Sequence, residues 1–315
     1  MVKAVSNLVQ GLARFTNKSL VKNLIVITLC VMFVFIQLFY PYDYYVSGHR
    51  NGSSAFQVGI HYVYEQDNLT DIYGQVAQIH DLGFKVIRIN FACDPLYPSD
   101  PINQKTDMFF QSTRYYNIAV ALVIPNDETI EYINYIQSIN YYLDRWGGNL
   151  TYIQVMNEPE TSSSWTVGAL FTDDEIISHF DSIYAAVESH HLSAQLYTNF
   201  GIGYVVRSNL PVEFSKKLNF VGLDVYMNSF LVMSPFFIEK LQAITHKDVV
   251  ITEFGMSTSD SAAQTNYIIS GLNLFKSMGL KGCWIVYWNS AYDNYGIRGT
   301  PTERAVGNWI AKNAK

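Results

Sequence analysis

Two glutamates, Glu158 and Glu253, each stand at the end of a short apolar run. Residues 155–159 read Val-Met-Asn-Glu-Pro, and residues 250–255 read Val-Ile-Thr-Glu-Phe-Gly. A pair of carboxyl groups, one protonated and one ionised, can cleave a glycosidic bond when the two flank it. Either glutamate alone could be a capping or ion-paired acid. Two such strand ends in one chain favour the catalytic interpretation.

The elements that must position these glutamates alternate along the chain, as in a parallel α/β fold. Apolar runs predict eight strands, at 56–62, 85–91, 117–124, 151–157, 194–199, 219–226, 248–253 and 282–288. Helical patterns lie at 69–81, 128–145, 173–190, 235–245, 260–278 and 301–312, and the segments after the second and fifth strands are less regular. We expect a closed (β/α)8 TIM barrel. A doubly wound open sheet is disfavoured because no G-x-G-x-x-G follows the first strand.

Side chains of a strand alternate between its two faces, so one phase of each strand points into a barrel. In one phase the predicted strands carry mainly polar or aromatic residues, and in the other nearly all residues are apolar. The residues of the first phase are Arg88 and Asn90 on the second strand, Gln154 and Glu158 on the fourth, Asp224 and Tyr226 on the sixth, Glu253 on the seventh, and Trp284 and Trp288 on the last. They are expected to converge at the carboxyl ends of the strands, where barrel enzymes keep their sites.

The two glutamate motifs resemble those of clan A of the glycoside hydrolases, whose acid/base and nucleophile end strands 4 and 7. Two further segments match in register: residues 82–89, Leu-Gly-Phe-Lys-Val-Ile-Arg-Ile, and the region from Trp288 through Tyr-Gly-Ile at 295–297 to Gly-Thr-Pro at 299–301. The resemblance covers about residues 56–312 and implies a retaining, family-5-like barrel.

By this resemblance Glu158 is the acid/base and Glu253 the nucleophile. Arg88 is expected to keep Glu253 ionised, since a nearby positive charge favours a carboxylate. Glu158 would need a drier setting that keeps it protonated. The resemblance also implies roles for three more residues: Asn157 binds the sugar 2-hydroxyl, Tyr226 bonds to the nucleophile, and Trp288 forms a stacking floor under the sugar.

His61 ends the first predicted strand and Asn126 follows the third, so both could reach the site, as sugar contacts or as structural hydrogen-bonding groups. The third strand ends Ile-Pro-Asn, without the histidine that many relatives carry. Short loops predict an open cleft, so the sugar is not specified. No metal-binding spacing or phosphate loop is present, and we expect no cofactor.

The expected partner is an oligosaccharide, polysaccharide or glycoconjugate. The formal net charge of −6 argues against a nucleic-acid partner. Two alternatives stay open: a transglycosidase that uses the same glutamates, and a barrel that binds carbohydrate at the cell surface without catalysis.

The N-terminal region predicts a membrane anchor. Residues 24–40 are apolar and uncharged, and four basic residues precede them. Seventeen residues, at about 1.5 Å each, reach the lower limit for crossing a bilayer. We expect a cytoplasmic tail at 1–23, a signal anchor at 24–40, a stalk at 41–55 and an extracellular barrel at 56–315. Secretion after signal cleavage is the alternative. Sequons at Asn51, Asn68 and Asn149 give weak support for export. We expect no disulfide between Cys93 and Cys283, which belong to opposite rims of the barrel.

Overall fold

The structure, a computed structural model, describes residues 55–93, 95–97, 99–125, 132–159, 172–202, 210–226, 228–289 and 294–314. The predicted tail, the anchor at 24–40 and nearly all of the stalk lie outside these ranges, so the membrane prediction stays a prediction. Among the helices of the described ranges, none combines the length and the apolar character needed to cross a membrane.

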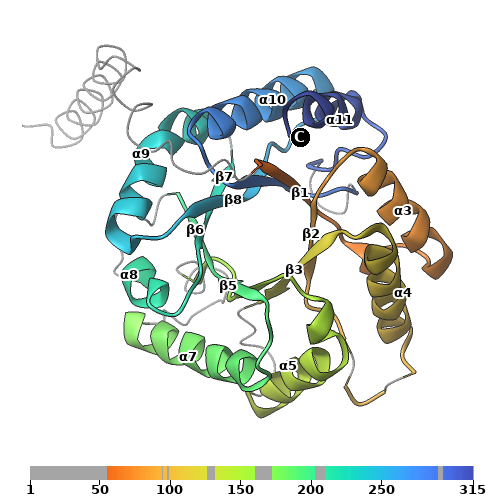
Figure 1. Ribbon diagram of the computed structural model, residues 1–315, viewed down its shortest axis with the longest axis vertical. Helices are drawn as coiled ribbons and strands as arrows, with labels where there is room; N and C mark the ends of the chain where they lie inside the picture. Colours follow the sequence, from red (N-terminus) through yellow and green to blue (C-terminus); the bar gives the residue numbers. More distant parts are fainter. Residues whose placement is uncertain are drawn as a thin grey trace, which may run out of the picture. The chain divides into compact units, whose positions relative to one another are not determined.

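A ring of parallel strands forms the centre of the fold (Figure 1). The strands of the described chain are β1 (Gln57–His61), β2 (Val86–Asn90), β3 (Ala119–Ile124), β4 (Tyr152–Val155), β5 (Gln195–Tyr197), β6 (Asn199–Gly201), β7 (Val221–Tyr226), β8 (Val249–Gly255) and β9 (Gly282–Ile285). All of the neighbouring pairs from β5 through β1 and β9 to β6 are parallel.

The fifth predicted strand, 194–199, is divided into β5 and β6, which are separated by Thr198 alone. Its first half pairs with β4 and its second half pairs with β7. The two ends of the sheet order are therefore one continuous segment of chain, and the barrel closes there. The predicted (β/α)8 barrel is confirmed, with its fifth strand in two pieces.

Helices surround the strands on the outside of the ring (Figure 1). They are α3 (Leu69–Asp81), α4 (Pro101–Tyr116), α5 (Tyr132–Trp146), α7 (Asp173–Ser189), α8 (Leu210–Ser215), α9 (Asn228–Thr245), α10 (Ser261–Ser277) and α11 (Pro301–Asn313), with short 3-10 turns η2 (Tyr64–Gln66) and η3 (Gly147–Asn149). The less regular segments after the second and fifth strands contain α4 and the short α8.

Helix α9 begins at Asn228, before the predicted start at residue 235. A proline normally marks a helix start because it lacks an N–H and leaves the carbonyl four residues earlier without its partner. Here Pro235 lies inside the helix. The carbonyl oxygen of Leu231, four residues before it, accepts a bond from the Ser234 hydroxyl at 2.8 Å. This local replacement allows α9 to continue through the proline.

The apolar side chains form two layers. Inside the ring lie Val86, Ala121, Tyr197, Phe220, Val250 and Trp284. Trp284 points inward as predicted, and Gly59 makes room for it, because a Cβ there would lie 2.5 Å from the indole Cδ1. The second layer packs the outer faces of the strands against the helices. Cys93 and Cys283 are not joined by a disulfide bond.

Two helical glycines give a test of this outer layer. A Cβ on Gly271 of α10 would lie 2.1 Å from Cζ of Phe254, whereas a Cβ on Gly74 of α3 meets nothing within 4 Å. Gly271→Ala should lower the free energy of unfolding by about 1–3 kcal/mol through overpacking. Gly74→Ala should raise it by roughly 0.5–1 kcal/mol, because alanine favours the helix. Urea denaturation measures both, and equal effects would contradict this packing of α10 on β8.

Candidate active site

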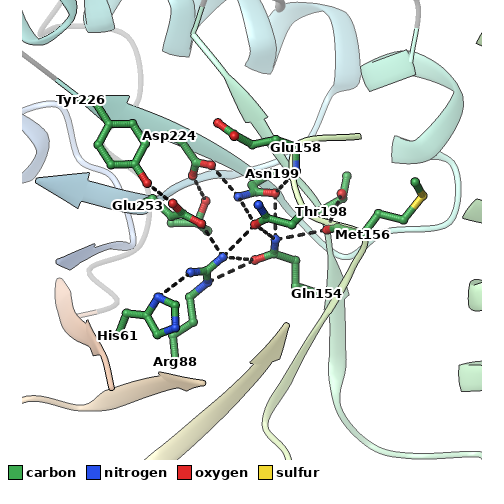
Figure 2. Close-up of polar contacts among 12 residues, drawn as sticks. His61, Arg88, Gln154, Met156, Glu158, Thr198, Asn199, Asp224, Tyr226 and Glu253 are labelled. Carbon is green, nitrogen blue, oxygen red and sulfur yellow. Dashed lines mark hydrogen bonds and ion pairs between the residues drawn. The ribbon is translucent and has the colours of Figure 1, made fainter. Parts of the chain in front are cut away.

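Polar side chains from β1, β2, β4, β6, β7 and β8 meet at the carboxyl end of the barrel (Figure 2). Arg88 is at the centre of this group and is only 2% exposed. Its Nη2 donates to Glu253 Oε1 at 2.5 Å and to Asn157 Oδ1 at 3.0 Å. Its Nε and Nη2 both donate to Gln154 Oε1, at 3.3 and 3.1 Å. A buried guanidinium with these partners has a fixed position and can orient a carboxylate.

His61 of β1 lies against the other side of this guanidinium. Its Nδ1 is 3.0 Å from Arg88 Nη1, and because arginine can only donate, this nitrogen accepts. Burial, followed by the charge of Arg88, lowers the pKa of His61 well below its usual range. His61 is therefore a neutral acceptor that helps to hold Arg88.

Glu253 is held by two donors. Arg88 bonds to Oε1, and the Tyr226 hydroxyl donates to Oε2. Burial and the charge of Glu253 raise the pKa of Tyr226 well above its usual value, so that this hydroxyl keeps its proton. For Arg88, burial is the largest single effect and would lower the pKa, but the electrostatic interactions with Glu253, Tyr197, Asp224 and Tyr226 together outweigh it and raise the pKa. Both neighbours thus hold the carboxyl group of Glu253 in a fixed position.

A β-bulge in β8 aims Glu253 into the barrel. Val250 packs inside the ring, so strict alternation would send Thr252 inward and Glu253 outward. The register to β7 shifts at this point, and Thr252 has no partner of its own. Both side chains consequently reach the interior: Thr252 donates to Asp224 Oδ1 at 2.8 Å, and Glu253 reaches Arg88. Bulges of this kind commonly re-aim a side chain beside an active site.

Glu158 lies on a strained turn directly after β4. Met156 has φ +66° and Glu158 has φ +41°, both in the left-handed region that non-glycine residues rarely adopt. Each such residue costs on the order of 1–3 kcal/mol. Neighbouring side chains hold the turn: Gln154 Nε2 donates to Met156 O at 3.1 Å, and Asn199 Oδ1 accepts from the Glu158 N–H at 2.8 Å.

The environment of Glu158 favours its protonated form. Burial raises the pKa of Glu158 most, and the negative charge of Glu253 raises it further, to about 7. A hydrogen bond with Asp224 and the charge of Arg88 oppose this rise. The two glutamates therefore differ in their surroundings: one is ion-paired, and the other retains a proton close to neutral pH. That difference is the requirement for separate acid and nucleophile roles.

Asp224 of β7 is a third buried carboxyl group in the cluster. Asn199 Nδ2 donates to its Oδ2 at 2.5 Å and Thr252 to its Oδ1 at 2.8 Å, so it pairs with polar groups inside the barrel. Burial, then the charges of Glu253 and Glu158, raise the pKa of Asp224 well above its usual range. A neutral Asp224 limits the negative charge that faces Arg88.

Of the predicted site residues, Arg88, Glu158, Tyr226 and Glu253 come together, with His61 beside them (Figure 2). Asn157 joins them through its hydrogen bond from Arg88. Asn126 lies outside the described residues. Within the described ranges, no group of three or more His, Cys, Asp or Glu side chains is arranged to hold a metal ion.

The prediction that Trp288 forms a stacking floor for a sugar is wrong. Its side chain is fully buried, its Nε1 donates to Gln75 of α3 at 2.8 Å, and its ring packs edge-on against Phe84. The strand β9 ends at Ile285, so its alternation does not continue to residue 288. Tyr287, at φ +59°, instead has its ring 4.9 Å from that of His61.

Three residues help to hold the site together although the sequence pattern did not assign them a role: Gln154, Thr198 and Asn199. Gln154 had the inward phase but no role. Asn199 is the last residue of the predicted strand 194–199, and its place at a strand end was the available signal. The division of that strand gives Asn199 its contacts on two sides. The sequence contains no signal that predicts this division.

No family model matches the sequence, and no curated protein matches it either. Several solved structures, in contrast, are similar to this chain. An endo-1,4-β-mannanase from Rhizomucor miehei has a TM-score of 0.65 at 12% identity, over 84% of this chain and 97% of the other. The endo-β-1,4-mannanase from Thermotoga petrophila gives 0.63 at 12%, over 84% and 78%. A psychrophilic family 10 endo-β-1,4-xylanase gives 0.57 at 14%, over 81% and 96%.

The chain has the fold of the clan A glycoside hydrolases. Identities of 12–14% establish this fold alone. In this fold the two glutamates occupy the ends of the fourth strand (β4) and the seventh (β8), when β5 and β6 are taken as one strand.

The raised pKa of Glu158 makes a prediction for stability. Its folded pKa, about 7, exceeds the ordinary 4.5, so the folded state binds the extra proton between these values. The free energy of unfolding should therefore fall as pH rises through this window. Glu158→Gln removes that loss: we expect no change at pH 4 and a gain of about 1–3 kcal/mol at pH 8. Urea denaturation at both pH values measures the difference.

The exposed Glu188, replaced in the same way, is the matched control and should show nearly the same effect at both pH values. A Glu158→Gln protein that gains no stability between pH 4 and pH 8 would contradict the environment described for this carboxyl group.

Proposed function

We propose that the protein is a retaining glycosidase that cleaves β-linked O-glycosides through a glycosyl-enzyme intermediate. One observation carries the proposal: Glu253 is bonded to Arg88 and Tyr226, while the pKa of Glu158, in the same cluster, is raised to about 7. The site thus supplies a carboxyl group paired with an arginine, suited to act as the nucleophile, and a protonated carboxyl group, suited to act as the acid, as double displacement requires.

In the first step Glu253 attacks the anomeric carbon while the bond to the leaving oxygen breaks. Glu158 gives its proton to that oxygen, so the departing group leaves as a neutral alcohol. In the second step Glu158 removes a proton from water, and the oxygen of that water attacks the anomeric carbon and releases Glu253. The sugar leaves with its original configuration, and Glu158 has recovered its proton.

The change in the role of Glu158 follows from its neighbour. The charge of Glu253 is one cause of the high pKa of Glu158. When Glu253 becomes a neutral ester, that cause disappears and Glu158 becomes a stronger acid, ready to exist as the base that the second step requires. Meanwhile Arg88 keeps its bonds to Gln154 and Asn157 and so stays in place.

Asn157 lies next to the acid/base and is suited to contact a substrate hydroxyl. Its Oδ1 accepts from Arg88 Nη2 at 3.0 Å, from Gln154 Nε2 at 2.8 Å and from Asn199 Nδ2 at 3.1 Å. Three donors on one oxygen fix which end of the amide is the carbonyl. The Nδ2 group is therefore the end that would donate to a sugar hydroxyl.

Alanine variants with azide test the two roles. In Glu158→Ala a nitrophenyl β-glycoside needs little proton assistance, so the first step survives while the second slows for want of a base. Azide should then restore turnover and give the β-glycosyl azide. In Glu253→Ala the nucleophile is gone, and azide should enter from the vacated face to give the α-azide. General acid–base help is worth about 10²–10⁴ in rate. NMR of the product identifies the anomer.

Exposed Glu188→Ala is the control and should keep wild-type rates. If the two azide products are exchanged between the variants, the roles are reversed. If both variants keep wild-type activity on every substrate, the reaction does not depend on these glutamates.

The substrate is proposed to be an oligosaccharide, polysaccharide or glycoconjugate with β-linkages. The similar structures include endo-β-1,4-mannanases and an endo-β-1,4-xylanase, and this supports β-mannans and β-xylans as the first polysaccharides to try. Aryl β-glycosides test the chemistry without a commitment to one sugar.

We also propose that residues 24–40 anchor the protein in a membrane with the barrel outside the cytoplasm. The support is the uncharged apolar run behind four basic residues. Protease added to intact cells should digest the barrel and leave an N-terminal tag protected. A barrel that resists protease in intact cells, and is digested only after lysis, would overturn this topology. Detection of the barrel alone in the medium would indicate cleavage instead.

A further inference from the structure

We propose that Asn199 is the positioning residue of the acid/base: it fixes the turn that carries Glu158 and joins that turn to Asp224. The inference rests on the proposed function for its kinetic consequences. Asn199 has no exposed surface and lies at the first position of β6, directly after the point where the fifth strand divides.

The orientation of the Asn199 amide is unambiguous. The backbone N–H of Glu158 can only donate, so the side-chain atom 2.8 Å from it must be the carbonyl oxygen, Oδ1. Gln154 Nε2 donates to the same oxygen at 2.8 Å. The Nδ2 group then donates to Asn157 Oδ1 at 3.1 Å and to Asp224 Oδ2 at 2.5 Å. One side chain thus connects the Glu158 backbone to the rest of the cluster.

The bond to the Glu158 N–H matters because the turn is strained. With φ at +41°, Glu158 has a backbone conformation that its own side chain disfavours. Such a conformation persists only where the surroundings enforce it. The preceding residue of the same segment acts in the same direction, since the Thr198 hydroxyl donates to Met156 O at 3.3 Å. The division between β5 and β6 therefore presents two adjacent side chains to the turn.

The position of Glu158 determines both which atoms its carboxyl group can contact and whether that group carries a proton. A misplacement of about 1 Å at a reacting group can cost on the order of 100-fold in rate. The ionisable groups that act on Glu158 come from three strands: Glu253 on β8, Asp224 on β7 and Arg88 on β2. A relaxed turn would change the distance to all of them and admit solvent to a carboxyl group that burial now keeps protonated.

The first test is Asn199→Ala across substrates with different leaving groups. A misplaced acid matters most for a poor leaving group, so kcat/KM for an alkyl β-glycoside should fall by about 100-fold or more. For a dinitrophenyl β-glycoside, which needs little proton assistance, the fall should stay within roughly 10-fold. Asn219→Ala is the matched control, since Asn219 Oδ1 accepts the Leu196 N–H at 2.7 Å before the start of β7, away from the site.

The second test reads the proton on Glu158 without any turnover. Carbon-13 NMR titration, with the Glu158 signal assigned by its loss in Glu158→Gln, gives the pKa in each variant. In Asn199→Ala it should move down from about 7 towards the ordinary 4.5 as the turn relaxes. Asn199→Asp, nearly identical in shape, adds a negative charge beside the turn and should raise it. Asn199→Asp also carries the test if the alanine variant does not fold.

The outcomes separate the two proposals. A wild-type protein with no glycosidase activity would contradict the proposed function. The carbon-13 NMR titration of Glu158 alone would then decide the role of Asn199. An active wild type whose Asn199→Ala variant loses the same factor on both substrates overturns the positioning role. A Glu158 pKa that is unchanged in both Asn199 variants overturns it as well.

Discussion

The site depends on the interaction of the Arg88 guanidinium with the carboxyl groups around it, which are buried with it at the end of the barrel. Three acids, Glu158, Asp224 and Glu253, lie in one buried cluster with it. Several buried negative charges cannot coexist without compensation, so some of these groups must carry protons. Arg88 bonds directly to Glu253, and the raised pKa values of Glu158 and Asp224 leave the protons on those two groups.

Much of the barrel could be predicted because its strands are apolar runs of ordinary length, and because inward polar residues repeat with a period of two. Arg88, Tyr226 and Asp224 follow that rule directly. Glu253 is a different case. The expected inward direction is correct, but its cause is the bulge at Thr252, which alternation alone does not reveal. Counted from the inward Val250, strict alternation would turn Glu253 outward.

Where a strand ends decides the remaining differences. Trp288 was assigned an inward direction because the last strand was taken to continue through residue 288, whereas β9 ends at Ile285. Beyond that point the left-handed backbone of Tyr287 changes which side chain faces the site, and the tryptophan becomes part of the core. Similarly, α9 starts earlier than the proline at position 235 indicates. The Ser234 hydroxyl bonds to the carbonyl oxygen that the proline leaves without a partner, and hydrophobic periodicity does not predict such a side-chain bond.

Strain and electrostatics meet at Glu158. A regular β4 would have continued along the barrel wall, but the left-handed residues at positions 156 and 158 end it. Holding such a turn requires acceptors and donors from the neighbouring strand, and the divided fifth strand supplies them through Thr198 and Asn199. The same contacts keep the carboxyl group buried, and burial is the largest cause of its raised pKa. The backbone conformation and the protonation state of Glu158 are therefore consequences of one packing arrangement, and a change in either should alter the other.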